Sequence, residues 1–237
     1  FDSNLGSLNQ SCNDVVVDSS GVYCGGTTYG SFIEPNSGAD IFMMKLNIND
    51  GGIIWVKHLG RNSAPSEDAV SRNDYCQGVA INDDGVFCAG STEGSLGEEN
   101  GGRKDFLFTR FNKANGNIDW IKQFGKDSEL VEGSSSDFDE CYSLAADSSA
   151  IYCGGRTRGG FGEPNGGNDD AVVLKLGSDI GNLIWVKQVG QSSERVPGAS
   201  RSRESCRGVA VDDSGVYCAG STYSNLGETR LSGFNAF

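Results

Sequence analysis

The chain has 237 residues, of which 35 are glycine and 4 are proline, and its 32 acidic residues outnumber 19 basic ones to give a net charge of −13. That charge disfavours nucleic acid and anionic membranes as partners, because both attract lysine and arginine. The scattered glycine argues against a helical bundle or coiled coil, and apolar runs of only four residues predict no membrane-spanning helix. Aromatic and aliphatic residues are numerous enough for one packed domain over residues 1–237.

A repeat of about 65 residues runs through the chain and determines the predicted fold. Cysteines occur in pairs 12 residues apart, and successive pairs lie 64 or 65 residues apart. Tryptophans recur with the same period, at Trp55, Trp120 and Trp185. Self-similarity at a fixed period is the signature of a repeat architecture. The predicted units are 7–60, 61–125, 126–190, and 191–237 together with 1–6.

Each unit is predicted to contain four short strands, as the second unit shows in chain order. Its strands are expected at 78–81, 86–89, 105–111 and 117–125, where aromatic and β-branched residues lie between clusters of Gly, Asn and Asp. A three-residue turn containing Gly85 joins the first two strands, and a long polar loop separates the second from the third. Four-stranded antiparallel units repeated about a hub predict an all-β fold, the β-propeller.

The two ends of the chain predict how the propeller closes. Residues 1–6 align with the fourth strand of the first unit, at 55–60, and residues 233–237 align with its third strand, at 38–42. The N-terminal strand is therefore the strand that the last unit lacks. Pairing it into the last unit would close a ring of four blades and remove the free edge. The alternative is that both ends are cuts in a longer array.

Three stretches of the repeat resemble the bacterial β-propeller repeat family of the SBBP type. They are the hairpin at 209–220, the strand at 40–46 and the Trp-containing strand at 185–190. The units of this chain are longer, and a Cys stands where the family usually has a Val or Thr beside the hairpin Tyr. The resemblance implies a propeller fold in secreted or surface-attached repeat proteins, with no catalytic residues to carry over.

The eight cysteines are predicted to form disulfides. Zinc sites need more closely spaced ligands and a redox C-x-x-C motif is absent, whereas an even number in strict repeat indicates bridges made in an oxidising compartment, outside the cell or on its surface. Pairing within a unit and between neighbouring units both respect the repeat. The within-unit pairs, which we favour, are Cys12–Cys24, Cys76–Cys88, Cys141–Cys153 and Cys206–Cys218.

Disulfide pairing within a unit is not compatible with a regular hairpin. A regular register sets Cys88 opposite Ala80 and Cys76 opposite Thr92, and this separation exceeds the reach of a disulfide. The first cysteine of each unit is therefore expected to curl in from the preceding loop.

A recurrent Glu-x-Asn-x-Gly stretch before the third strand is a candidate calcium site. Calcium takes oxygen ligands from carboxylates and amide carbonyls, although the spacing matches no EF-hand loop. The alternative is that these Asn and Asp side chains only hydrogen-bond turns. No other cofactor is predicted. The candidate ligands are Glu34, Asn36, Asp40, Glu98, Asn100, Asp105, Glu163, Asn165 and Asp170.

Three further kinds of residue are singled out by the pattern. The repeated tryptophans could form a sugar platform, but a Trp at one fixed place in every unit is more typical of the core between units. His58 replaces the Gln of the other units and has no obvious nucleophile partner, so no enzyme is predicted. Asn9 begins the glycosylation sequon Asn-Gln-Ser.

The predicted function is structural. Strand alternation places all long loops on one face, where specific binding is expected. Loop 126–140 carries a charge of −5 and loop 191–205 a charge of +1, so we expect copies of the chain to associate through this face as subunits of a surface fibre, appendage or coat. The alternative is an extracellular lectin-like or protein-binding module that uses the same face. Candidate assembly contacts are Arg201, Arg203, Leu130, Val131 and Val196.

Overall fold

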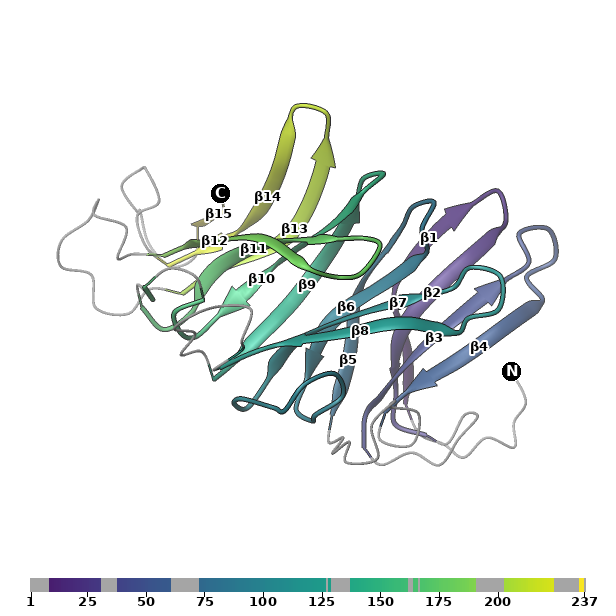
Figure 1. Cartoon of the computed structure of the whole chain (residues 1–237), viewed down its shortest axis with the longest axis horizontal. Helices are drawn as coiled ribbons and strands as arrows, with labels where there is room; N and C mark the ends of the chain where they lie inside the picture. The colour runs from purple at the N-terminus through teal and green to yellow at the C-terminus, as the bar shows by residue number, and fades with distance from the viewer. Residues whose placement is uncertain are drawn as a thin grey trace.

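Four antiparallel β-sheets follow one another along the chain in the computed structural model (Figure 1). The structure describes residues 9–30, 38–60, 73–126, 128, 137–161, 164–165, 167–190, 203–223 and 235–236. These residues contain no helix, and so no helix long and apolar enough to cross a membrane. Each of the first three sheets has four strands in sequence order, and the last has three.

The strands of each sheet come from one repeat. The first sheet contains β1 (Gln10–Asp18), β2 (Gly21–Thr28), β3 (Asp40–Leu46) and β4 (Ile53–Leu59). The second contains β5 (Asp74–Ile81), β6 (Val86–Thr92), β7 (Asp105–Phe111) and β8 (Ile118–Phe124). The third contains β9 (Asp139–Ala146), β10 (Ala150–Thr157), β11 (Asp170–Gly177) and β12 (Leu183–Val189). The last contains β13 (Glu204–Asp212), β14 (Gly215–Thr222) and β15 (Asn235–Ala236).

Two kinds of short turn connect the strands. Between β1 and β2, the Asp18 carboxylate accepts a hydrogen bond from the Ser20 amide at 2.8 Å, which is the usual way in which Asp stabilises a turn. The turns that join the third and fourth strands each contain a glycine in the left-handed region, a conformation that other residues adopt only with strain. These are Gly51, Gly116 and Gly181, with φ of 71°, 72° and 69°.

A β-bulge follows the first cysteine of every sheet. One extra residue is left out of the register between the first and second strands, so the first strand bends at this point. The bulged residues are Asn13, Gln77, Tyr142 and Arg207. The first and second strands also pair on the N-terminal side of the bulge. β5 therefore begins at Asp74, four residues earlier than the hydrophobic pattern predicts.

The sheets are packed face to face in a row. The first strands of successive sheets lie beside one another, and parallel bridges such as Lys104↔Phe138 connect each sheet to the next. Figure 1 shows the first sheet at one end of the row and the β13–β14 hairpin at the other. Each sheet is thereby covered on a face by its neighbour.

The hydrophobic core consists of these sheet-to-sheet junctions. At the first junction, Tyr23, Met43 and Trp55 of the first sheet pack with a group that includes Val79 and Leu107 of the second. The second junction joins Phe87, Phe106 and Phe108 to Leu144, Ile151 and Val172. Burial of this kind stabilises a fold by about 1.5–3 kcal/mol per large side chain.

Trp55 and Trp120 belong to this core, as predicted for residues at one fixed place in each unit, whereas Trp185 is half-buried and lies beside Tyr152 of its own sheet. Trp55 is buried, and its indole Nε1 donates to the Lys113 carbonyl of the next sheet at 3.2 Å. Trp120 repeats the contact with the Ser178 carbonyl at 3.3 Å. Each ring therefore spans two sheets.

The predicted all-β repeat of four-stranded antiparallel units is confirmed, and β15 pairs with β14 where a third strand was expected. Closure into a four-bladed ring is not seen in the described strands, which form an open row (Figure 1). The strand expected to complete the last unit, residues 1–6, lies outside the described residues.

Candidate functional site

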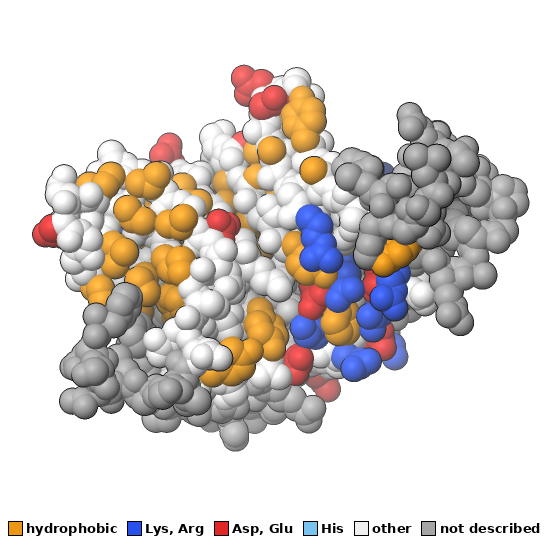
Figure 2. Space-filling model, turned by 180° about the vertical axis from the view of Figure 1, so that it is seen from behind, with side chains coloured by type: hydrophobic (Ala, Val, Ile, Leu, Met, Phe, Trp, Pro, Cys, Tyr) orange, Lys and Arg blue, Asp and Glu red, His pale blue; other side chains and the backbone are white. Residues whose placement is uncertain are grey.

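Five basic side chains gather where the loop-rich ends of the second, third and last sheets meet. They come from just before β7, from the end of β10, and from the start of β13. Figure 2 shows them as a patch of blue side chains with acidic and hydrophobic groups between them. This basic cluster consists of Lys104, Arg156, Arg158, Arg203 and Arg207.

Two buried carboxylates hold the basic cluster together. Glu140 accepts from Lys104 Nζ and from Arg156 Nη2, both at 2.7 Å. Asp169 lies 3.2 Å from Arg156 Nη1 and 2.7 Å from Arg158 Nε. Arg156 therefore bridges both carboxylates, and its planar guanidinium suits such a double contact.

Aromatic rings support the same cations. The Phe138 ring centroid lies 5.2 Å from Lys104 Nζ and 4.4 Å from the Arg158 guanidinium carbon. The Tyr142 ring lies 4.4 Å from the Arg207 guanidinium carbon. A cation over a ring face within about 6 Å is attracted by the ring quadrupole.

The bulges position part of this cluster. Tyr142 and Arg207 are the bulged residues of the third and last sheets. A bulge changes the direction of the side chain it carries, and here it brings two residues from different sheets into a stack. The same scaffold position carries Asn13 and Gln77 in the other two sheets, so its chemistry differs from unit to unit.

The protonation states of the cluster follow from its contacts. Burial alone would raise the pKa of Glu140, but hydrogen bonds from Lys104 and Tyr142 and the charge of Arg156 outweigh it and hold that pKa below its ordinary value. Burial, together with the Glu140 charge, raises the pKa of Tyr142. Its hydroxyl therefore stays protonated and donates to Glu140 at 2.8 Å.

The basic cluster is an exception on an acidic protein. Five cations face two carboxylates, whereas the whole chain carries a charge of −13. Arg203 and Arg207 are exposed, so guanidinium groups at the rim reach solvent. Such groups bind carboxylates, sulfates and phosphates through charge-assisted hydrogen bonds.

The sequence carries a partial signal for the cluster, in the places where the repeat is broken. The positions of Glu140 and Arg156 are occupied by Tyr75 and Ser91 in the second unit and by Ser205 and Ser221 in the last. Only the third unit therefore carries this ion pair. Partners from other units cannot be identified from the repeat, because they meet only when the sheets stack.

The four disulfides pair within units, as favoured from the sequence: Cys12–Cys24, Cys76–Cys88, Cys141–Cys153 and Cys206–Cys218. The expected curling of the first cysteine from a loop is wrong. Cys76 lies inside β5 opposite Gly90, and Cys88 lies opposite Val79. The bulge at Gln77 brings the two Cα atoms to 5.7 Å, within the usual range for a bridge.

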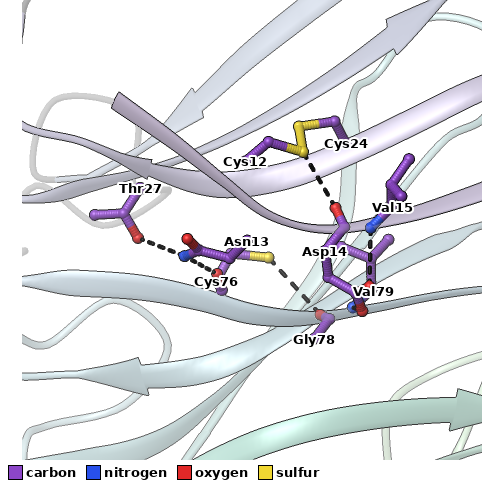
Figure 3. Close-up of a disulfide and its surroundings, with 9 residues drawn as sticks. All are labelled: Cys12, Asn13, Asp14, Val15, Cys24, Thr27, Cys76, Gly78 and Val79. Atoms are coloured by element: carbon purple, nitrogen blue, oxygen red, sulfur yellow. Dashed lines mark hydrogen bonds between the residues drawn. A yellow bond between two sulfur atoms is a disulfide. The ribbon is translucent and has the colours of Figure 1, made fainter. Parts of the chain in front are cut away.

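Residues beside the disulfide connect neighbouring sheets. Figure 3 shows Asn13 and Asp14, which follow Cys12, reaching the first strand of the second sheet. Asn13 Nδ2 donates to the Cys76 carbonyl at 2.8 Å, and Asp14 Oδ2 accepts from the Val79 amide at 2.7 Å. Bridge, bulge and junction therefore form one structural unit.

The candidate calcium ligands hold loops and strand ends where the structure describes them. Asn100 accepts from the Gly102 amide at 3.0 Å, and Asn165 accepts from the Gly167 amide at 2.8 Å. Asp105 Oδ2 accepts from Gln123 Nε2 at 2.8 Å. Among the described residues, no group of three or more His, Cys, Asp or Glu side chains could hold a metal ion.

The other candidate residues fall into three groups. Arg203 Nε lies 3.8 Å from Asp169 of the same chain, so this cation already has an acidic neighbour. Asn9 is exposed, and His58 is buried at the position that Gln123 occupies in the second unit. Outside the described residues lie Glu34, Asn36, Glu163, Leu130, Val131, Val196 and Arg201.

Comparison with known proteins does not assign this chain to a family. No protein-family description matches it, and no curated protein sequence does. The sheets, the disulfides and the basic cluster are therefore the basis for a functional assignment.

Proposed function

We propose that this chain is a non-enzymatic extracellular structural protein, a repeat subunit of a surface fibre, appendage or coat. One observation carries the proposal: the same sheet-to-sheet junction recurs along the chain, with Trp55 and Trp120 in equivalent contacts. A scaffold that repeats one junction sets spacing and shape, and repeat proteins of this kind are extended by adding units. The sheets are then propeller-type blades, in line with the SBBP resemblance.

The disulfides support the extracellular part of the proposal. Four bridges and no free cysteine are compatible with an extracellular or secreted protein, because such bridges persist in oxidising compartments. Each bridge closes a hairpin beside a junction, and so stabilises the structure where sheets meet.

Assembly can be tested directly on the oxidised chain. Light scattering after size exclusion, over a wide range of protein concentration, is expected to show mass rising in steps of one chain, and negative-stain microscopy is expected to show rings or filaments. A chain that remains monomeric at every concentration would overturn the proposal.

The basic cluster favours a second candidate function, binding of an anionic ligand at the loop-rich face. Sulfated or carboxylated polysaccharides present the anions that the exposed Arg203 and Arg207 can engage at its rim. Titration with a sulfated polysaccharide is expected to show salt-sensitive binding that Arg207→Gln weakens and Lys187→Gln, on β12, does not. Equal binding of a neutral polysaccharide would contradict this function.

A further inference from the structure

The two ends of the row present opposite halves of the junction found inside it. The leading face is the outward side of the first sheet and includes Cys12, Val15, Val17 and Ile53. The trailing face is the outward side of the last sheet and includes Tyr217 and Ala219. Residues at the same repeat positions in the inner sheets are covered by a neighbouring sheet.

The leading face exposes side chains whose counterparts are core. Val15 is 56% exposed, whereas Val79 at the same position in the second sheet is 2% exposed and packs in the first junction. Ile53 is likewise exposed, whereas its counterpart Ile118 packs against the first junction. Figure 2 shows hydrophobic side chains gathered over this end of the molecule.

The trailing face shows the complementary difference. Tyr217 is 52% exposed, whereas its counterparts Tyr23, Phe87 and Tyr152 are at most 3% exposed. Ala219 is also exposed. Its counterpart Ala89 in the second sheet is fully buried and packs in the second junction.

This exposure is specific to the ends of the row. Ile184 is also 51% exposed, but so is its counterpart Ile54 to a similar degree, and the second sheet has Asp119 there. That position therefore faces water in each of the first three sheets, the ones whose fourth strand the structure describes. Val15 and Tyr217, in contrast, are exposed only where the row has no further sheet.

The turn between β3 and β4 also indicates that the leading face lacks the neighbour that the inner sheets have. An added Cβ on Gly116 would lie 2.7 Å from the ring of Trp55 in the preceding sheet, and one on Gly181 would lie 3.0 Å from the ring of Trp120. The equivalent Gly51 has nothing within 4 Å. The first sheet thus has the receiving geometry of an inner sheet without the sheet that fills it.

We propose that copies of this chain associate head to tail, with the trailing face of one copy docked on the leading face of the next. Tyr217 and Ala219 would then meet Val15 and Cys12 as Phe87 and Ala89 meet Leu144 and Cys141 inside the chain. The proposal rests on the structural function proposed above and identifies the surfaces that join the copies.

A second copy is the occupant that these faces fit. The internal junctions show that each face accepts the opposite face of the same repeat, with its disulfide and bulge in place. Because the two faces differ, the contact is heterologous, and such contacts produce rings when the rotation closes and filaments when it does not. The loop residue Arg203, paired with Asp169 of its own chain, is not needed for this contact.

Two single variants and their mixture test the arrangement. Val15→Asp and Tyr217→Asp each place a carboxylate in one face only, and should weaken self-association by at least about tenfold, because an unpaired charge would be buried. Ile184→Asp is the matched control, since the second sheet carries Asp at that position, and should assemble like the wild type. A cooperative thermal unfolding transition in each variant, measured at a dilution where the wild type is monomeric, would show that all variants are folded.

The mixture decides the polarity of the contact. Val15→Asp keeps an intact trailing face and Tyr217→Asp an intact leading face, so equal amounts should form a heterodimer and no larger species in sedimentation velocity. If wild-type chains assemble and Val15→Asp has no effect, or if the mixture stays monomeric, the head-to-tail contact is wrong while the structural function stands. If wild-type chains do not assemble, both fail.

Discussion

The second and the last sheets are built from the same repeat, yet one is covered on both faces and the other on one. Phe87 of the second sheet is buried against the third, whereas Tyr217 at the same position has no sheet beyond it. The sequence of a unit therefore determines which side chains face a junction, and the neighbouring unit determines whether they are buried. Stability in such a chain is a sum of unit and nearest-neighbour contributions.

The largest expected difference between the two sheets comes from this position. Phe87→Ala should lower the free energy of unfolding by about 3–5 kcal/mol, because it leaves a cavity in a packed junction. Tyr217→Ala should change it by no more than about 0.5 kcal/mol, as expected for a surface site. Chemical denaturation of the monomeric protein measures both, and equal losses would show that the last sheet is covered.

The disulfides allow the same comparison at constant loop length, because every bridge spans 12 residues. Replacing Cys141 and Cys153 together with Ala should cost about 2–4 kcal/mol. Replacing Cys12 and Cys24 should cost less, because Cys12 is exposed whereas Cys141 and Cys153 are both buried, so the inner pair leaves the larger cavity. A larger loss for the Cys12–Cys24 pair would contradict the exposed position of the first sheet.

Two glycine turns provide a smaller contrast. Gly51→Ala should cost about 1–2 kcal/mol, since φ is positive and a Cβ strains the left-handed conformation. Gly116→Ala has the same φ but adds contact with the Trp55 ring, and should cost about 1–3 kcal/mol more as an overpacked site. Thermal unfolding of the two variants side by side measures the difference. Identical midpoints would mean that the Trp55 ring moves away from the added Cβ without loss of stability.

The period of the cysteines and tryptophans predicts the repeating units, and the aromatic and β-branched runs predict four strands in each, but the period leaves disulfide pairing within units and between neighbouring units both open. It did not predict the bulges, because one unpaired residue such as Gln77 leaves the alternation of apolar side chains readable on both sides. The row also depends on the angle between neighbouring sheets. The packing of side chains such as Phe87 and Leu144 sets this angle, and the length of the repeat does not predict it. The basic cluster was missed for a similar reason: Lys104, Arg156 and Arg203 come from three different units.

The smallest expected effect concerns two buried carboxylates with opposite pKa directions. The pKa of Glu140 is lowered, because contacts with Lys104, Tyr142 and Arg156 outweigh burial. Burial raises the pKa of Asp105, against hydrogen bonds from Gln123 and Gly101. Ionised Glu140 therefore stabilises the fold above its unfolded pKa, and this contribution is lost as pH falls through the folded value. Ionised Asp105 has the opposite sign, because the folded state favours its protonated form.

Substitution should separate the two groups. Glu140→Gln should cost about 1.5 kcal/mol at pH 7, the lower end for hydrogen bonds to charged groups. The difference from wild type should shrink as pH falls below the ordinary glutamate pKa of about 4.3, and should be lost once pH is also below the lowered folded pKa, where the wild-type carboxylate is protonated in both states. Asp105→Asn should show the reverse trend, comparing most favourably with wild type at neutral pH and losing that advantage in acid. Urea denaturation at a series of pH values measures both curves. Parallel curves for the two variants would show that contacts with Lys104 and Arg156 do not set the charge of Glu140, and that the basic cluster is not held together by its buried carboxylates.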